Sequence, residues 1–251
     1  MGPVRPKLGL TLLRLFTVQG SYNYERMLGL GIGVAEEPLL RDLTADGRGG
    51  DAAYRRAVAR AAHFFNAHPY LCGLAVGAAA RAEHDGVPPE HVERLRSALC
   101  GPLGSLGDRL VWAGWLPCTS ALAVAALTLG LGWWAAVAFL VIYNAGHVAL
   151  RWWALRAGWE YGTRVAAALH HPVLLRAAAI IGPATALATG LALPLAAAYL
   201  GDLFAGGVKV AVAGGAAVGF LALRFKPGLV TGVRLGLAFV ALALLWGLAW
   251  R

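Results

Sequence analysis

The second half of the chain consists of long apolar runs separated by short polar or glycine-rich interruptions. A helix needs about 20 mostly apolar residues to cross a bilayer, and several runs approach that length. The first two runs are separated by the sequence GLG. We therefore predict about five transmembrane helices, which would occupy residues 110–130, 133–150, 173–200, 207–223 and 228–250.

The N-terminal part is more polar, and its pattern predicts amphipathic helices at the membrane surface. Residues 8–18 have a helical pattern that Arg14 interrupts, which favours an interfacial segment over a signal peptide. Pro38, at the end of GLGIGVAEEP, predicts a turn. The glycines and aspartate of residues 44–50 predict a loop, and Asp51 is placed to cap a helix that runs to about Phe65.

Two apolar stretches between these parts are too short to span a bilayer. Residues 68–80 are bounded by charged positions, and residues 100–108, CGPLGSLGD, are interrupted by glycine and proline. Non-helical backbone at membrane depth is tolerated only where protein buries it or where it lines a cavity. We therefore expect one all-α integral membrane domain, 1–251, with amphipathic helices over 1–67, re-entrant hairpin segments over 68–108 and transmembrane helices over 109–251.

Composition agrees with this prediction. The chain is 59% hydrophobic and only 14% charged, whereas a soluble domain carries about 25% charged residues. The net charge of +9 comes mostly from arginines beside apolar runs, so we interpret it as a topology signal rather than a nucleic-acid surface. Basic loops at 151–172 and 224–227 are then cytoplasmic, and the C-terminus lies outside. Cys72, Cys100 and Cys118 form no CxxC pair and are interpreted as small apolar residues.

The sequence HFFNAHPYL, residues 63–71, carries the densest group of polar side chains. Pro69 suits the first turn of a helix, so Asn66 and His68 would lie beside exposed backbone N–H groups. Such an arrangement can hold a polar ligand through neutral hydrogen bonds. The alternative is a capped helix whose histidine bonds a neighbouring carbonyl.

Two further motifs contain candidate residues. GPLGSLGD lacks the ending of a P-loop, but Asp108 stands just before an apolar run. It could pair with Arg109 or Arg14, cap a helix, or accept a hydrogen bond from a substrate. In YNAGHVALRWW, Asn144 and His147 share a helix face but are too few for a metal site, and Arg151, Trp152 and Trp153 are typical of an interfacial belt. The sequence shows no Ser/His/Asp triad and no Cys/His pair.

Together these motifs resemble one family. LFTVQGSYNYERM, HFFNAHPYL, GPLGSLGD and YNAGHVALRWWALRAGWEYG occur in the order and spacing of the IID component of the mannose-type (mannose/fructose/sorbose) phosphotransferase system. The similarity is strong over residues 8–172 and weaker beyond. Four spaced motifs make the resemblance specific, although one of them alone would not.

The resemblance implies a transport subunit without a cofactor or phosphorylated residue of its own. Such proteins pair with a IIC membrane subunit in the bacterial inner membrane, in an elevator-type arrangement described as a trimer of IIC–IID heterodimers. Together the two subunits move a hexose that the IIB and IIA proteins phosphorylate. Sugar hydroxyls need hydrogen-bond partners when they are buried. We therefore expect substrate contacts from residues Gln19, Asn23, Glu25, Asn66, His68 and Asp108. For the first motif, the alternative is an amphipathic anchor.

The chain also departs from the family pattern at Arg109, Leu116 and His147. In the family these positions commonly hold proline, arginine and arginine. The departures leave open a regulatory or scaffold role in phosphotransferase signalling rather than bulk sugar uptake. A further alternative is an unrelated membrane enzyme that uses His68 and Asp108, which would act without a IIC partner.

Overall fold

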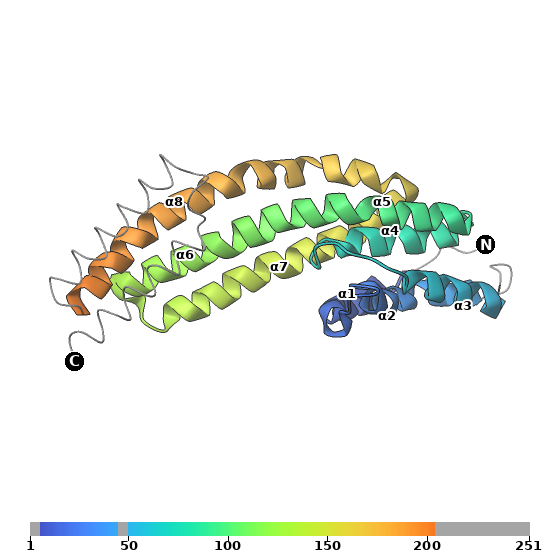
Figure 1. Cartoon of the computed structure of the whole chain (residues 1–251), viewed down its shortest axis with the longest axis horizontal. Helices are drawn as coiled ribbons and strands as arrows, with labels where there is room; N and C mark the ends of the chain where they lie inside the picture. Colours follow the sequence, from blue (N-terminus) through green and yellow to red (C-terminus); the bar gives the residue numbers. More distant parts are fainter. Residues whose placement is uncertain (1–5, 45–49, 204–251) are drawn as a thin grey trace. The chain divides into compact units, whose positions relative to one another are not determined.

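The computed structural model describes residues 6–44 and 50–203, and its regular structure there is helical, with only two isolated β-bridges. This confirms the expected all-α class. The α-helices are α1 (Leu8–Leu15), α2 (Gly29–Leu40), α3 (Gly50–Ala61), α4 (Cys72–His84), α5 (Pro89–Gly107), α6 (Leu116–Ala126), α7 (Trp134–Tyr161) and α8 (Pro172–Leu203) (Figure 1). Three segments are the tighter 3₁₀ helices η1 (Val18–Ser21), η2 (Arg41–Thr44) and η5 (Gly162–His170). Two are the wider π-helices η3 (Asp108–Trp115) and η4 (Leu127–Leu131). The chain divides into two units, 1–193 and 194–251, and the arrangement below concerns the first.

Pro38 does not form the predicted turn but lies inside α2, which continues to Leu40. A proline inside a helix leaves the carbonyl four residues earlier without its N–H partner. Here that carbonyl belongs to Val34, and the Arg14 guanidinium donates to it at 2.8 Å. The predicted loop at 44–50 falls mostly on residues 45–49, which lie outside the described residues, and α3 ends at Ala61 rather than near Phe65.

The predicted break at 100–108 is wrong, because α5, η3, α6 and η4 follow one another as continuous helix from Pro89 to Leu131. The signal for a break was the glycine-rich sequence, but Gly107 serves a close contact instead. A Cβ atom added to Gly107 would overlap the side chain of His68. The glycine therefore allows the 63–71 segment to pack directly on the helix, and the chain does not turn there.

Two helical stretches of the described chain are long and apolar enough to cross a membrane, Pro89–Leu131 and Trp134–Tyr199. The predicted division between the first two spans is confirmed, since helix ends at Leu131 and α7 begins at Trp134. The predicted loop at 151–172 is wrong, because α7 continues to Tyr161 and η5 follows it. The predicted spans at 207–223 and 228–250 lie outside the described residues.

The core of this unit is the crossing of α4 and α7 (Figure 1), and nearly all of α4 is buried. Backbone meets backbone at this crossing. A Cβ atom on Gly77 would lie 2.5 Å from the carbonyl oxygen of Leu155 and 2.5 Å from the amide nitrogen of Trp159. Small residues let membrane helices approach this closely. Whether α4 enters the membrane from one side, as a re-entrant segment would, stays a prediction.

This packing predicts that Gly77→Ala destabilises the chain by about 1–3 kcal/mol, because one methyl group forces two backbones apart. Gly101→Ala is the matched control, since nothing lies within 4 Å of a Cβ atom there. The control should be neutral or stabilising by up to about 1 kcal/mol, because alanine is the better helix former. Thermal unfolding of the full chain in detergent measures both. A Gly77→Ala protein that melts at or above the wild-type temperature would contradict this account of the crossing.

Candidate functional site

The polar segment 62–71 joins α3 to α4 and passes beside the first motif of the sequence. The amide of Phe65 donates to the carbonyl of Arg26 at 3.2 Å, and the amide of Leu28 donates to the carbonyl of Phe65 at 2.9 Å. We call residues 62–71 the site loop. Its backbone therefore holds the sequences QGSYNYERM and HFFNAHPYL side by side, although about forty residues separate them.

A buried ion pair fixes the beginning of the site loop. Arg96 of α5 donates to Glu36 of α2 at 2.8 Å and to the carbonyl of Ala61 at 2.6 Å, and its guanidinium lies 5.4 Å from the ring centre of Phe65. Both charged side chains are buried, with 4% and 2% of their surface exposed. Burial raises the pKa of Glu36 to about 7, although the charge of Arg96 acts in the opposite direction.

A second buried arginine fixes the end of the site loop. Arg151 of α7 is 2% exposed, so it does not belong to the interfacial belt that the sequence predicted. Its guanidinium donates to the carbonyl of Leu15 and to Nε2 of His147, the latter at 2.7 Å, and lies 4.7 Å from the ring centre of Tyr70. No carboxylate pairs with Arg151 within the described residues. Carbonyl, imidazole and aromatic groups stabilise its charge instead.

His68 is the most deeply buried of the six predicted contact residues, with 2% exposure. Its Nδ1 accepts from the amide of Tyr70 at 3.2 Å, so the ring proton resides on Nε2. Burial, with smaller contributions from Arg151 and His147, lowers the pKa of His68 to about 4 and keeps the ring neutral at pH 7. The Nε2 atom is buried without a hydrogen-bond partner in the described structure. A buried donor without a partner is costly, which marks it as a position for an incoming acceptor.

Three predicted contact residues, Asn66, His68 and Asp108, belong to the two segments that meet where His68 packs on Gly107. His68 packs against Gly107, so Asp108 follows directly after the contact, and Asn66 precedes His68 by two residues. The Trp112 ring centre lies 5.2 Å from that of His68. Asn66 and Asp108 are both exposed. Asp108 does not pair with Arg14, which instead pairs with Glu37 at 2.7 Å.

The other three predicted contact residues are placed differently. The side chain of Asn23 closes a turn, since its Oδ1 accepts from the amides of Glu25 at 3.1 Å and Arg26 at 2.9 Å. Glu25 is exposed one residue before the backbone contact with the site loop. Gln19 is exposed on η1, and no hydrogen bond of its side chain to the site loop is found in the described chain. Asn23 therefore has a local structural role, which the sequence did not predict, and the amphipathic anchor considered for this motif stays a prediction.

Sequence reasoning missed the residues that hold the site loop in place. Three of them are the charged residues Glu36, Arg96 and Arg151, which lie within largely apolar or amphipathic helices. A charge among apolar neighbours was the sequence signal that could have identified them. Tyr70 was also missed, although its hydroxyl lies 2.7 Å from the hydroxyl of Tyr143 on α7. Charged residues in such surroundings face protein partners rather than lipid.

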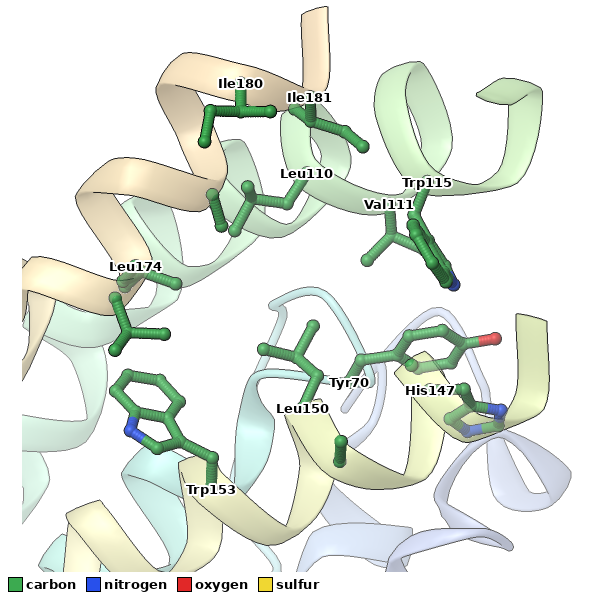
Figure 2. A pocket seen from close by; sticks show the side chains of 14 residues that line it. Tyr70, Leu110, Val111, Trp115, His147, Leu150, Trp153, Leu174, Ile180 and Ile181 are labelled. Atoms are coloured by element: carbon green, nitrogen blue, oxygen red, sulfur yellow. The ribbon is translucent and has the colours of Figure 1, made fainter. Parts of the chain in front are cut away.

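A cavity of about 490 Å³ adjoins the site loop at Tyr70, and His147 of α7 also lines it. Figure 2 shows Leu110, Ile180 and Trp153 among the side chains around it. Its lining is almost wholly hydrocarbon. A sugar would lose its hydrogen bonds to water there without replacement, so the cavity is unsuited to a sugar.

Comparison with known proteins agrees with the motif resemblance. A family model described as the PTS system mannose/fructose/sorbose family IID component matches residues 6–186, more than half of the chain. The chain belongs to this family. Membership, together with the apolar helices, identifies a membrane protein.

Relatives of this IID chain come from several bacteria. The sorbose-specific EIID component of Klebsiella pneumoniae is 34% identical over 158 residues, covering 61% of this chain and 56% of the relative. The fructose permease IID component of Bacillus subtilis is 26% identical over 151 residues, covering 58% and 53%. The mannose-specific EIID component of Escherichia coli K12 is 26% identical over 155 residues, covering 60% and 53%. The matched regions span about half the length of these relatives.

Two solved structures share the fold of this IID chain. One, described as a membrane protein, superposes with a TM-score of 0.63 and 22% identity over 73% of this chain and 67% of the other. The other is a chain from the complex of the mannose transporter ManYZ with microcin E492, with a TM-score of 0.58 and 20% identity over 97% and 96% of the two chains. These likenesses establish the fold.

The buried ion pair predicts a large effect of Arg96→Met in this IID chain. At a pH well above 7, removing one partner of a buried pair costs about 3–5 kcal/mol, because the other charge stays buried without compensation. The loss in unfolding free energy should be smaller at acidic pH, where Glu36 takes up a proton and is buried as a neutral acid. Chemical denaturation of the purified chain measures the loss.

Two variants control this prediction. Adding Glu36→Gln to Arg96→Met should recover most of the lost stability, since no buried charge remains. Arg94→Met changes an exposed arginine on the same helix and should leave stability near that of the wild type. Equal stability of the Arg96→Met and Arg94→Met proteins would show that the pair does not hold the site loop.

Proposed function

We propose that this chain is the membrane IID subunit of a sugar-transporting phosphotransferase system. In this proposal it is a multi-pass protein of the bacterial inner membrane that pairs with a IIC subunit. The pair binds and translocates a hexose, IIB and IIA carry out the phosphoryl transfer, and the chain itself is not an enzyme. The match of residues 6–186 to the IID family is the observation that carries the proposal. An elevator-type movement and a trimer of IIC–IID heterodimers complete it.

Within this function, we place the sugar at the exposed rim of the site loop. The Nε2–H group of His68 is a buried donor without a partner among the described residues, and a sugar hydroxyl oxygen is a suitable acceptor. Asn66 and Asp108 lie on the two segments that meet at His68 and are exposed to an incoming ligand. The ring of Trp112, 43% exposed, offers an apolar face beside His68. Because His68 itself is 2% exposed, contact with sugar requires Trp112 or the loop to shift.

The regulatory alternative rests on departures such as Arg109 and His147. In the structure, His147 accepts a hydrogen bond from buried Arg151 and stacks on Tyr70 at 4.0 Å between ring centres. His147, one of the residues that depart from the family pattern, therefore packs against Tyr70 and Arg151 behind the site loop. A membrane subunit without transport would still bind IIB but would not move sugar, so uptake separates the two functions.

The proposal predicts that Asn66→Ala weakens sugar binding by about 1–3 kcal/mol, or about 5–150-fold, because a bound hydroxyl loses its partner. The measurement is binding and uptake of mannose, fructose and sorbose by membrane vesicles that contain the chain with its IIC, IIB and IIA partners. His68→Phe, which keeps an aromatic ring but removes the Nε2–H donor together with the Nδ1 acceptor of the Tyr70 amide, should show a loss at least as large.

The matched control is Asn144→Ala. Within the described residues, the side chain of that exposed asparagine bonds the carbonyl of Leu140 in its own helix, at 2.7 Å, and no other group, so sugar affinity should not change. Co-purification of IIC with each variant shows that the assembly is intact. Wild-type affinity and uptake in intact Asn66→Ala and His68→Phe assemblies would move the sugar site elsewhere, and the absence of uptake by the wild-type assembly would favour the regulatory role.

A further inference from the structure

The apolar cavity beside α7 has no role in sugar binding, yet it is large enough to hold a ligand. Its volume of about 490 Å³ lies within the range of about 300–1,000 Å³ that is typical of small-molecule sites. Leu110 and Val111 of η3 form one wall, Leu150 and Trp153 of α7 face them, and Ile181 of α8 closes one side (Figure 2).

The surroundings of the cavity favour hydrocarbon as its occupant. All its walls except Tyr70 come from the two stretches that are long and apolar enough to cross a membrane. Water gains few hydrogen bonds in an apolar cavity and does not fill it stably. The acyl chains of the bilayer are the apolar groups that surround such helices in abundance. An acyl chain can therefore fill the cavity without the cost of burying a polar group.

Positive charge stands next to the cavity in sequence. Arg109 directly precedes Leu110, and Arg176 directly precedes Ala177, which also lines the cavity. Both arginines are exposed, and neither forms an ion pair with any described residue. From residue 162 to residue 201 the sequence contains no Asp or Glu. Asp108 is the one acidic neighbour, and it forms no ion pair with Arg109 in the described structure.

We propose that the cavity binds one acyl chain of an anionic phospholipid, whose phosphate is held by Arg109 and Arg176. Arginine matches phosphate oxygens in geometry and charge. The lining residues from Val173 to Ile181 span eight helical steps, about 12 Å along α8, so a chain anchored near Arg176 can lie along this wall. The lipid would pack α8 against η3 and α7, behind the site loop.

The test uses photoactivatable phosphatidylglycerol, with the probe on an acyl chain, in membrane vesicles that contain the full chain. Labelled peptides are mapped by mass spectrometry, and the proposal predicts labels on residues 173–181 or 146–153. Ala177→Trp fills the cavity. Each methylene excluded weakens binding about fourfold, so the loss of two reduces labelling about fifteenfold. Ala179→Trp is the matched control, because Ala179 is exposed on α8 and does not line the cavity.

A second pair of variants tests the headgroup and does not alter the cavity. Arg176→Gln should remove the preference for labelling by phosphatidylglycerol over phosphatidylcholine, whereas Arg94→Gln, an exposed arginine away from the cavity, should keep it. Undiminished labelling of 173–181 and 146–153 in Ala177→Trp would overturn the proposal. Equal labelling by the two lipids in the wild type would overturn its anionic part. If the wild type is not labelled at these residues and Ala177→Trp abolishes co-purification of IIC, the cavity is a protein interface instead.

Discussion

The positively charged guanidinium of Arg96 is buried, and the groups that stabilise it also fix the beginning of the site loop. Burying an ion costs several kcal/mol unless its geometry and hydrogen bonds compensate. Arg96 meets this cost with the carboxylate of Glu36, the carbonyl of Ala61 and the face of Phe65. These groups belong to α2, α3 and the site loop, so one guanidinium fixes three segments. Arg151 holds the other end, and no carboxylate of the described residues pairs with it.

This arrangement explains why so polar a sequence lies in a membrane protein. The first motif supplies backbone groups that pair with Phe65, and Asn23 closes the turn that presents them. The site loop is then fixed at both ends and packed on Gly107 in its middle. His68 is thereby buried, with a hydrogen-bond partner for Nδ1 and none for Nε2 in the part of the chain that the structure describes. The polar residues thus divide into those that build the loop and those that remain available to a ligand.

The sequence predicted the helical membrane class, the family and the division between the spans at 130–133, because long apolar runs and spaced motifs are local signals. It did not predict that helix continues through CGPLGSLGD, since glycine permits a turn and a close contact equally and only the neighbour, His68, decides between them. Pro38 was misjudged for a similar reason, because Arg14 replaces the lost hydrogen bond from a distance. Arg151 resembled a belt residue, because its burial depends on Leu15 and Tyr70, which are remote in sequence, as well as on His147 one turn earlier in α7.

The central claim is that the site loop presents the Nε2–H of His68 to the sugar. NMR of ¹⁵N-histidine-labelled chain in the assembled transporter observes that nitrogen directly, and His68→Phe identifies its signal. We expect a protonated Nε2 and a non-protonated Nδ1 without sugar, and a shift of the Nε2 signal as the transported sugar saturates the assembly. An Nε2 signal that stays unchanged at saturating sugar, in an assembly that transports it, would contradict the account.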